Sequence, residues 1–573
     1  MYVRLRQTTA CLILACCCSA AQAASVAPVA GEHGMVVTAQ HLATQVGVQV
    51  LQQGGNAVDA AVAVGYALAV VYPAAGNLGG GGFMTILLAD GRKTVLDFRE
   101  KAPLAAGPDM YLGSDGRVVE NLSRRGFLAV AVPGTVSGLE TALVRYGTMK
   151  RAALLTPAIR YAEQGFVLEQ GDADMLRVAT EPFRKDAAAA AIFLDHGEAY
   201  LPGKRLVQKD LARTLRQISN QGTKGFYQGP VGTAIIAASK EGKGILTQSD
   251  LDQYETRERA PIECDYRGYH IISAPPPSAG GVILCEILNV LEGYPLKDLG
   301  FGSAQAVHYE IEAMRHAYLD RNNYLGDPDF VRNPVEHLLD KAYAQRLRAA
   351  IDPAKAGVSD DLQPGVAPHE GSDTTHYSIV DQFGNAVSVT YTLNGWFGAK
   401  VVAPGTGVLL NNEMDDFTVK EGVPNLFALV QGSANAIAPG KRPLSSMCPT
   451  IITRDGKLVM VAGTPGGSRI ISAMVQVLLN LVDYGMNIQE AVDAPRLHQQ
   501  WQPDSTLMEN FALSPDTQKI LLAMGHKLMR SRPANHVTAI LVGAPSLGGV
   551  AVGANRYYGA DDPRGNTGLA LGY

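Results

Sequence analysis

Two alternating runs of polar and apolar residues, 374–380 and 386–394, flank a short turn, and this pattern constrains the fold more than any other in the chain. Alternation with a period of two is typical of β-strands, so the sequence predicts an antiparallel hairpin. If the loop has three residues and ends at Gly384 in the left-handed conformation, Thr374 lies opposite Thr392. The length of the loop therefore decides which side chains share a face.

This register separates polar from apolar side chains. A loop one residue shorter or longer would shift the pairing and mix the two faces. In the predicted register the polar face carries Thr374, His376, Ser378, Ser388, Thr390 and Thr392, and the apolar face carries Tyr377, Ile379, Val387, Val389, Tyr391 and Leu393. The sequence thus predicts two threonines that meet on a small polar face at the end of a hairpin whose other face is core.

The hairpin alone leaves the role of these threonines open. Paired threonines are common in sheets because of their β-propensity and mutual hydrogen bonding, without any catalysis. His376 lies two residues along the strand from Thr374, roughly 6–7 Å. We therefore expect His376 to be structural and not the base for the Thr374 hydroxyl.

The rest of the chain predicts layers of helix and sheet. Helices are expected over 42–51, 57–71 and 304–325, a strand over 83–88, and a second hairpin over 451–461 that turns at Asp455-Gly456. The run 57–71 is almost wholly small and apolar, which predicts a helix buried on all sides. The four glycines 79–82 lack the spacing of a phosphate-binding loop, so we expect a backbone that passes close to another group. Helical patterns in the middle and strand pairs in the last third favour packed layers.

The first 24 residues have the order of a secretory signal peptide: a charged start, a short apolar run and an Ala-x-Ala cleavage site. The apolar run, 10–20, is too short to span a bilayer. Cleavage as a lipoprotein before Cys16 is the alternative. We predict a signal peptide over 1–24 and a mature protein that is periplasmic or secreted, with no stable membrane span.

The composition is that of an ordinary globular protein, because the 573 residues are 47% hydrophobic and 18% charged and no low-complexity linker divides them. One large folded unit is expected. Removing the leader takes away Arg4 and Arg6, so 47 basic residues remain against 54 acidic ones and the formal charge is −7. Neither a basic patch nor an acidic tail suggests nucleic acid as a partner. The remaining cysteines, Cys264, Cys285 and Cys448, are too few for a disulfide framework, so stability is expected to come from packing.

Common hydrolase and zinc signatures are absent from the sequence, which contains neither Gly-x-Ser-x-Gly nor His-Glu-x-x-His. A threonine hydroxyl is still a nucleophile if its own α-amine acts as the base, because a free α-amine has a pKa of about 7.7–8.0. This requires Thr374 to be an N-terminus. The hypothesis is that the chain is cut between Asp373 and Thr374, by attack of the Thr374 hydroxyl on the preceding carbonyl.

Five separated motifs resemble those of the gamma-glutamyltransferases, also called glutathione hydrolases. They are Asp97-Phe-Arg-Glu-Lys-Ala-Pro103, Thr374-Thr-His-Tyr-Ser378, Leu410-Asn-Asn-Glu-Met-Asp-Asp-Phe417, Lys441-Arg-Pro-Leu-Ser-Ser-Met447 and Gly463-Thr-Pro-Gly-Gly-Ser-Arg-Ile470. The similarity runs from about Gly34 to Tyr573, which is nearly the whole mature chain.

The resemblance implies an α+β N-terminal-nucleophile hydrolase that folds as a four-layer αββα sandwich. It implies one precursor that is cut into a large subunit, 25–373, and a small subunit, 374–573, which together form one catalytic unit. The implied activity takes the γ-glutamyl group from glutathione and related amides, through a γ-glutamyl-threonine ester, to water, amino acids or peptides. No metal or organic cofactor is implied.

Four residues match the catalytic positions of the family. Thr374 matches the nucleophile and new N-terminus, and Thr392 matches the residue that hydrogen-bonds to it and helps to activate it. The hairpin register led to the same pair. Gly466 and Gly467 match the oxyanion loop, whose backbone N–H groups hold the charge of the tetrahedral intermediate.

Six further residues match the binding site for the glutamyl group. Arg99 matches the guanidinium that holds the α-carboxylate, a task suited to its planar donors. Ser445 and Ser446 match its hydroxyl partners, and Asn394, Glu413 and Asp416 match the cluster around the α-ammonium. Taken singly, each of these charges would more often lie on the surface. Together they suit the two charged ends of an amino acid.

One segment departs from the pattern of some members. The segment 418–440 matches the lid loop of bacterial members, but Phe427 stands where some carry a tyrosine. The hydroxyl of that tyrosine bonds to the asparagine that Asn394 matches. Phe427 can cover the pocket without this hydrogen bond, so the sequence leaves open how tightly the lid closes.

Two other functions remain as alternatives. A β-lactam side-chain acylase of the same fold would bind a glutaryl group, which lacks the α-ammonium, and the presence of Asn394, Glu413 and Asp416 argues against it. A periplasmic amino-acid-binding protein without chemistry would need Arg99 and Asp416 but no free amine on Thr374. An uncut chain would favour this second alternative.

Overall fold

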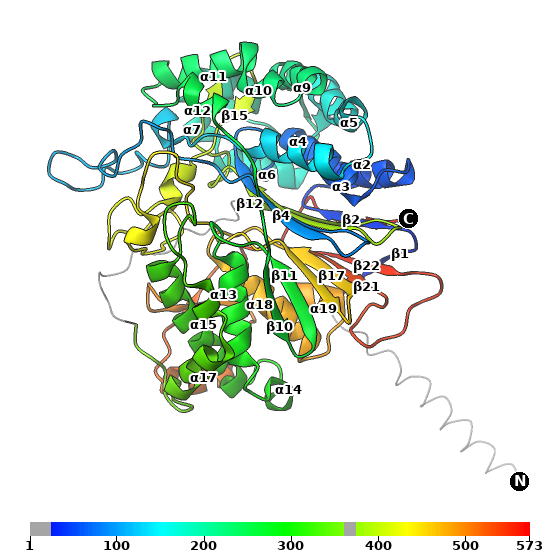
Figure 1. Ribbon diagram of the computed structural model, residues 1–573, viewed down its shortest axis with the longest axis vertical. Helices are drawn as coiled ribbons and strands as arrows, with labels where there is room; N and C mark the ends of the chain where they lie inside the picture. Colours follow the sequence, from blue (N-terminus) through cyan, green and yellow to red (C-terminus); the bar gives the residue numbers. More distant parts are fainter. Residues whose placement is uncertain (1–24, 360–373) are drawn as a thin grey trace, which may run out of the picture.

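The computed structural model describes residues 25–359 and 374–573. The predicted signal peptide, 1–24, and the residue before the predicted cut, Asp373, lie outside the described residues. The described part of the chain forms two seven-stranded antiparallel sheets with helices on their outer faces (Figure 1).

The first sheet has the strand order β1-β22-β21-β17-β16-β11-β10. The bounds are β1 Val29–Gly31, β22 Tyr557–Asp561, β21 Thr538–Val542, β17 Lys457–Gly463, β16 Thr450–Arg454, β11 Tyr269–Ser273 and β10 Ile262–Tyr266. The second sheet has the order β23-β2-β12-β13-β3-β4-β9. Its bounds are β23 Leu569–Gly572, β2 Met35–Thr38, β12 Thr374–Val380, β13 Ala386–Thr392, β3 Gly81–Leu87, β4 Lys93–Asp97 and β9 Arg257–Arg259.

Helices cover the outer face of each sheet, so the layers run helix, sheet, sheet, helix (Figure 1). On the second sheet lie α2 His41–Gln52, α3 Ala57–Val71 and α4 Thr135–Tyr146; α5 Arg151–Gln164 packs on α3, α9 Lys209–Gln221 packs on α5, and α11 Gly229–Glu241 lies on the same side of the molecule. On the first sheet lie α13 Gly280–Leu291, α18 Arg469–Val482 and α19 Ile488–Asp493, and α15 Ala304–Tyr324 and α17 Lys341–Ala350 pack on α13. The predicted four-layer αββα sandwich is confirmed.

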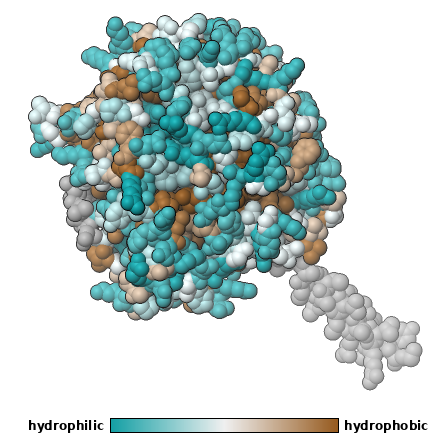
Figure 2. All heavy atoms as spheres, in the orientation of Figure 1, coloured by the Kyte–Doolittle hydropathy of each residue, from teal (hydrophilic) through white to brown (hydrophobic). Residues whose placement is uncertain are grey.

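Shorter elements complete the described part of the chain. The helices are α6 Gln170–Val178, α7 Thr180–Phe183, α8 Ala187–Phe193, α10 Lys224–Tyr227, α12 Gln248–Asp252, α14 Leu296–Leu299, α16 Val335–Leu338 and α20 Pro515–Ala523. The strands are β5 Phe166–Val167, β6 Leu194–Asp195, β7 Glu198–Ala199, β8 Arg205–Leu206, β14 Val402–Ala403, β15 Val408–Leu409, β18 Leu497–His498, β19 Thr506–Met508 and β20 Leu528–Arg530. Hydrophilic side chains cover most of the face seen in Figure 2, with apolar patches between them.

The hairpin β12–β13 has the predicted register. Thr374 pairs with Thr392, and Val380 pairs with Ala386. Gly384 closes the three-residue loop with φ of 91°, in the left-handed region that glycine tolerates. Every residue of both strands is buried, because the hairpin lies in the middle of its sheet.

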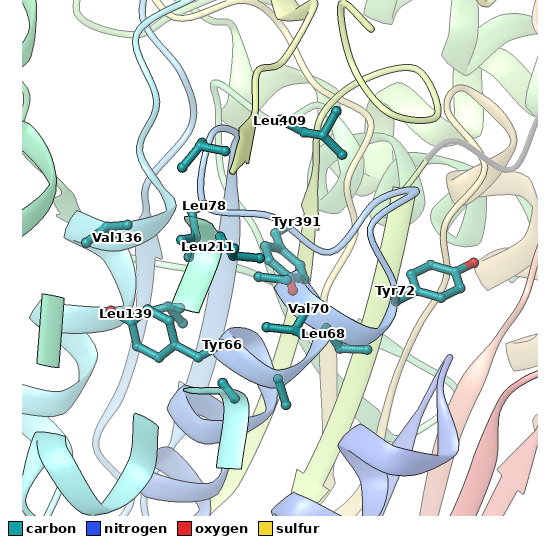
Figure 3. Packing of buried hydrophobic residues seen from close by; sticks show 14 of the residues in the cluster. Tyr66, Leu68, Val70, Tyr72, Leu78, Val136, Leu139, Leu211, Tyr391 and Leu409 are labelled. Carbon is teal, nitrogen blue, oxygen red and sulfur yellow. The ribbon is translucent and has the colours of Figure 1, made fainter. Parts of the chain in front are cut away.

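The two faces of this hairpin pack against different layers. On the apolar face, the Tyr377 hydroxyl donates to the Ala61 carbonyl over 3.1 Å, and α3 is buried along its whole length, as predicted. Figure 3 shows Tyr391 among the apolar side chains of α3. The polar face packs on the first sheet, where Ser378 donates to the Thr538 carbonyl over 3.1 Å. The polar face is therefore interior and not a surface, and the hydroxyl groups of Ser378 and Ser388 donate to backbone carbonyls of the opposite sheet.

The glycines 79–82 bring the chain against the end of β13. A Cβ on Gly80 would lie 1.9 Å from the Thr392 carbonyl oxygen, and one on Gly82 would lie 2.3 Å from that of Thr390. No side chain fits at either position. The predicted close approach of the backbone is confirmed, and the neighbouring group is the strand that carries Thr392.

The expectation that packing alone stabilises the chain is corrected by a disulfide. Cys264 of β10 and Cys285 of α13 are bonded, with their Cα atoms 6.0 Å apart, while Cys448 is free and buried. The bond ties an edge strand of the first sheet to the helix that covers it. The 21-residue separation between these cysteines carried no signal for pairing.

The remaining helix and hairpin predictions hold within a few residues. Helix α15 ends at Tyr324, and β16 and β17 form the second hairpin with Asp455 and Gly456 both at positive φ. Over residues 25–359 and 374–573, no helix is both long and apolar enough to cross a bilayer.

Candidate active site

A small buried pocket collects nine of the ten predicted site residues. These are Thr374, Thr392, Gly467, Arg99, Asn394, Glu413, Asp416, Ser445 and Ser446. The tenth, Gly466, precedes Gly467 in the same turn. Arg321, Phe427, Leu429, Met447 and Ile470 complete the lining. Residues from both sides of the predicted cut therefore converge on the first residue of β12.

Sheet edges and turns position these groups. Thr374 begins β12, Thr392 ends β13, and Asn394 follows with φ of 73°. Arg99 comes two residues after β4, and the acidic residues lie on a short 3₁₀ helix, Glu413–Asp416. The site thus rests on the ends of neighbouring strands of one rigid sheet.

The two threonine hydroxyl groups face one another in this pocket. The Thr374 Oγ1 donates to the Thr392 Oγ1 over 3.4 Å. Thr392 Oγ1 also accepts from the Asn394 backbone N–H over 2.9 Å, which fixes its position. Both side chains are almost fully buried, at 4% and 2% exposed. The predicted pair is confirmed as a contact.

His376 is engaged within the hairpin. Its Nδ1 lies 2.8 Å from the Thr390 hydroxyl, and its Nε2 lies 3.2 Å from the Ser378 hydroxyl. Burial lowers the pKa of this imidazole to about 3, so it is neutral near pH 7. The predicted structural role fits these contacts.

The turn Gly466-Gly467 lies between β17 and α18. Its φ values are 131° and 56°, and a Cβ on Gly467 would lie 2.3 Å from the ring of Phe427. Within the described residues, neither amide of the turn donates a hydrogen bond. Helix α18 begins two residues later, so its positive end faces the same region. Two backbone donors are therefore available to an anionic oxygen.

The Arg99 side chain is fully buried and paired with the predicted ammonium ligands. Its guanidinium donates to Glu413 and to Asp416, and its Nε donates to the Pro443 carbonyl over 3.2 Å. The Glu100 carboxylate lies 3.7 Å from the same guanidinium. Arg99 is expected to hold the carboxylate of an amino acid, and Glu413 and Asp416 its ammonium group. In the structure these three side chains neutralise one another.

Three carboxylates share this one guanidinium, and the crowding changes their protonation. Burial raises the pKa of Glu413 well above its usual range and raises that of Glu100 to about 7. Burial also raises the pKa of Asp416 despite the attraction of Arg99. Within the described residues, both Glu100 oxygens and the Glu413 Oε2 have no hydrogen-bond donor. The cluster has more acceptors than donors and suits a cationic ligand group.

The serines predicted to assist Arg99 lie beside a second arginine. Ser446 Oγ accepts from the Arg321 Nη2 over 2.9 Å, and Ser445 Oγ accepts from the Met447 backbone N–H over 3.1 Å. Arg321 belongs to α15 and is 1% exposed, and burial lowers its pKa to about 10. Arg321 and Glu100 were not predicted from the sequence. Glu100 adjoins Arg99 in its motif, whereas Arg321 sits in a helical pattern that gives no sign of a buried charge.

The segment 418–440 covers the pocket without regular helix or strand, apart from a 3₁₀ turn at Ser433–Asn435. Phe427 and Leu429 line the pocket from above. The Gln500 side chain donates to the carbonyls of Phe427 and Ala428 over 3.2 and 3.1 Å. The Asn394 amide, the predicted partner of a lid tyrosine, donates to the Asn412 carbonyl instead, over 3.0 Å. The Gln500 side chain thus holds the backbone of this lid, and no aromatic hydroxyl of the described residues bonds to Asn394.

One group of the described residues has the side chains and spacing that could hold a metal ion, and it lies outside the pocket. It consists of His308, Glu312 and His526, all buried. His308 Nδ1 and His526 Nε2 are 2.8 Å apart, which is a hydrogen-bond distance, and Glu312 accepts from Arg315. The His526 Nδ1 lies 3.9 Å from Glu312 and has no hydrogen-bond partner among the described residues.

Comparison with known proteins agrees with this geometry. The family model described as gamma-glutamyltranspeptidase matches residues 43–572. A glutathione hydrolase proenzyme of Pseudomonas sp. (strain A14) is 69% identical over 98% of both chains, and that of Escherichia coli K12 is 47% identical over 95% of this chain and 93% of the relative. The crystal structure of a cephalosporin acylase from Bacillus halodurans superimposes with a TM-score of 0.83 at 27% identity, over 97% of this chain and 98% of that one. The chain belongs to the gamma-glutamyltranspeptidase family.

Proposed function

We propose that this chain is a self-processing γ-glutamyl transferase and hydrolase that acts on glutathione and related γ-glutamyl amides. One observation carries the proposal: a single buried pocket holds a threonine hydroxyl, an arginine–carboxylate cluster suited to an α-amino acid, and Gly467, which belongs to a turn with two unused amides. The names of the similar proteins, glutathione hydrolase proenzymes, support it.

Processing comes first in this proposal. The Thr374 hydroxyl attacks the Asp373 carbonyl, the C–N bond breaks, and the resulting ester is hydrolysed by water. The products are a large subunit, 25–373, and a small subunit that begins at Thr374 with a free α-amine. The leader over 1–24 supports export to the periplasm or the medium before or during these steps.

Donor binding exchanges one set of ion pairs for another. The α-ammonium of the γ-glutamyl group binds to Glu413, Asp416 and Asn394. The α-carboxylate binds to Arg99, Ser445 and Ser446. The guanidinium keeps a carboxylate partner throughout, because the ligand replaces the protein carboxylates that Arg99 now holds. The cost of desolvating Arg99 is therefore met before the ligand arrives.

Acyl transfer then follows from the pocket geometry. The Thr374 α-amine accepts the proton of its own hydroxyl as Oγ1 attacks the γ-carbonyl, and Thr392 holds Oγ1 in place. The amides of Gly466 and Gly467 bind the oxyanion, and each such donor contributes about 10²–10³ in rate. The C–N bond breaks, the amine leaves with the proton, and the γ-glutamyl ester remains. Water or an acceptor amine attacks the ester and releases Thr374.

The acylase alternative rests on the similarity to a cephalosporin acylase. Glutaryl substrates carry no α-ammonium, so they would leave Glu413 and Asp416 crowded around Arg99. Hydrolysis of γ-glutamyl p-nitroanilide and glutaryl p-nitroanilide separates the two functions. We expect a strong preference for the γ-glutamyl compound, and a preference for the glutaryl compound would replace the proposal by the alternative.

Intact-mass analysis and N-terminal sequencing test the mechanism. The parent protein should give two fragments, one of which begins Thr-Thr-His-Tyr, and Thr374→Ala should give one chain without turnover. Thr374→Ser keeps a hydroxyl and serves as the control that still processes. A fully active uncut chain, or turnover by Thr374→Ala, would overturn the mechanism, and an uncut inactive parent that binds glutamate would favour the binding-protein alternative.

A further inference from the structure

The cluster of His308, Glu312 and His526 joins the two parts of the chain that the proposed cut would separate. His308 and Glu312 are four residues apart on α15, so their side chains share one face of that helix. His526 follows α20, beyond the cut. The three residues are 0%, 2% and 3% exposed, respectively. Both parts of the chain therefore contribute to one buried group of polar side chains.

Hydrogen bonds around His308 determine which ring nitrogens carry protons. The His308 Nε2 lies 2.8 Å from the Asp352 carbonyl oxygen, which can only accept, so this nitrogen carries a proton. In a neutral ring the His308 Nδ1 then has a lone pair, and it accepts from the His526 Nε2 over 2.8 Å. Without an extra proton on either ring, the His526 Nδ1 also has a lone pair.

This last nitrogen has no donor to accept from. The His526 Nδ1 faces the Glu312 carboxylate over 3.9 Å, which is too long for a hydrogen bond, and has no hydrogen-bond partner in the described part of the chain. A buried acceptor without a donor is unfavourable. Here two acceptors, an imidazole nitrogen and a carboxylate oxygen, lie near one another, and a cation bound between them would satisfy both.

We propose that His308, Glu312 and His526 bind a zinc ion, at a site separate from the active-site pocket. Imidazole and carboxylate groups are ligands that zinc uses in proteins. One atom of each residue can be chosen so that all three lie within 4.8 Å of one another. Two ligand atoms of a tetrahedral zinc ion are about 3.3–3.5 Å apart, so small side-chain rotations bring the three to bonding distance.

The His308 ring already has the orientation that a metal ligand needs. Metal-bound histidines usually donate their other ring N–H to a carboxylate or a backbone carbonyl, as His308 does to Asp352. Binding requires the His526 ring to turn, because the His308 Nδ1 now accepts from it and would hold the ion instead. Both ligating nitrogens carry lone pairs before binding, so neither ring has to lose a proton.

Arg315 is the cation that would compete with a metal ion for Glu312. Its Nε donates to the Glu312 carboxylate over 3.3 Å. Its Nη1 also donates to the Asp504 carboxylate and, over 2.6 Å, to the Ser359 hydroxyl. Because Arg315 keeps the charged partner Asp504, Glu312 can bind an ion without leaving a buried guanidinium unpaired.

In the cut protein, the ion would connect the two fragments. His308 and Glu312 belong to the large subunit, 25–373, and His526 belongs to the small subunit, 374–573. This consequence rests on the proposed function, whereas the site itself requires only the fold. Zinc that binds the folded pair and not the unfolded chains should stabilise the pair.

Zinc analysis tests the site in protein that is produced without a histidine tag in zinc-supplemented medium and then dialysed against metal-free buffer. We expect about one zinc ion per chain in the parent, and less than about a tenth of that in His308→Gln and in His526→Gln, since each substitution removes a ligand. His196→Gln replaces an exposed histidine outside the cluster and is the matched control, which should bind as the parent does. Thr374→Ala should also bind zinc, although it stays one chain.

Thermal unfolding gives a second readout. Zinc at about 10²–10³ times its Kd should raise the Tm of the metal-free parent by about 2–4 °C. The Tm of His526→Gln should not respond to zinc. Each protein is compared with itself with and without the ion, so destabilisation by the substitution does not mask the result.

A parent protein that binds no zinc and shows no Tm response would overturn the site. Zinc retained by both His308→Gln and His526→Gln would identify an adventitious ion bound elsewhere and would overturn it as well. A parent that binds zinc but remains one uncut, inactive chain would overturn the proposed function and leave the site in place.

Discussion

The chain buries two clusters of arginine and carboxylate side chains that are built on opposite principles. In the pocket cluster, Glu100, Glu413 and Asp416 surround the single guanidinium of Arg99. In the second cluster, Arg496 and Arg564 share Asp562, and Arg564 also holds Glu509. The first cluster has an excess of negative charge, and the second is balanced.

Because of this difference in charge, the pKa values of the carboxylates shift in opposite directions in the two clusters. In the balanced cluster, burial alone would raise the pKa of Asp562, but the attraction of Arg496 and Arg564 wins and lowers it below its usual value. In the pocket cluster, burial wins and the pKa values of Glu413 and Asp416 are raised. A buried carboxylate with a raised pKa has too few hydrogen-bond donors around it. The ammonium group of a ligand would supply those donors. We therefore propose that the first cluster binds substrate and that the second only stabilises the fold.

Removing a carboxylate from the pocket cluster should have the largest effect. Asp416→Asn removes a partner of the substrate ammonium, so kcat/KM on γ-glutamyl p-nitroanilide should fall about 10²–10³-fold. The same change relieves crowding around Arg99, so the free energy of unfolding should stay within about 1 kcal/mol of the parent. Steady-state kinetics and urea unfolding measure the two quantities. A stable variant with parent activity would contradict the assigned role of Asp416.

The matched change in the balanced cluster should do the reverse. Asp562→Asn leaves Arg496 and Arg564 buried without their shared partner, which should lower the free energy of unfolding by about 3–5 kcal/mol. Activity per folded molecule should be unchanged, because the residue does not line the active-site pocket. Loss of turnover at full stability would show that this cluster also takes part in catalysis or substrate binding.

The two clusters should also differ in their pH dependence. Binding of the product L-glutamate needs ionised carboxylates, and the pKa of Glu100 is raised to about 7 by burial. Binding should therefore strengthen about tenfold from pH 6 to pH 8, as the cluster loses its proton. Inhibition constants for L-glutamate measure this without involving the nucleophile. Glu100→Gln should flatten the profile, and an unchanged profile would remove Glu100 from the account.

The balanced cluster works in another pH range. Since the pKa of Asp562 is lowered on folding, its contribution to stability is fully present above the unfolded-state pKa of about 3.9 and is lost as pH falls through the lower folded-state pKa. Stability between pH 6 and pH 8 should not change on its account.

The smallest effect concerns the lid, which covers the pocket cluster only. Phe427→Tyr adds a hydroxyl beside the pocket, and one hydrogen bond contributes about 0.5–1.5 kcal/mol. We expect the ratio of transfer to hydrolysis to rise about two- to fivefold, because a better-held lid excludes water. Product analysis with a dipeptide acceptor measures the ratio. No change would mean that the Gln500 hydrogen bonds already hold the lid closed.

Local patterns in the sequence predicted much of the fold. The register of β12–β13 followed from the alternation and one glycine turn, and the buried α3 followed from its small apolar residues. The interior position of the polar hairpin face did not follow, because alternation tells two faces apart but not which layer covers each. The Cys264–Cys285 bond depends on tertiary packing in the same way.

The residues of the candidate site were likewise predicted only in part from the sequence. Motif resemblance supplied Arg99, Glu413 and Asp416 as separate ligands for the two ends of a substrate, and the structure brings them together as ion pairs. Arg321 was missed because its charge lies in a helix whose burial comes from distant segments.

Strand order has a consequence for the fragments that a break before Thr374 would create. In one sheet, β2 from before that point lies between β23 and β12 from beyond it, and β13 pairs with β3. In the other sheet, β1 pairs with β22 and β11 pairs with β16, so two further ladders join the fragments. Neither fragment holds a complete sheet of its own, so separating the two fragments would expose unpaired strand edges. Dissociation is therefore coupled to unfolding, and the unfolding temperature of the cut protein, unlike that of an uncut polypeptide, depends on protein concentration.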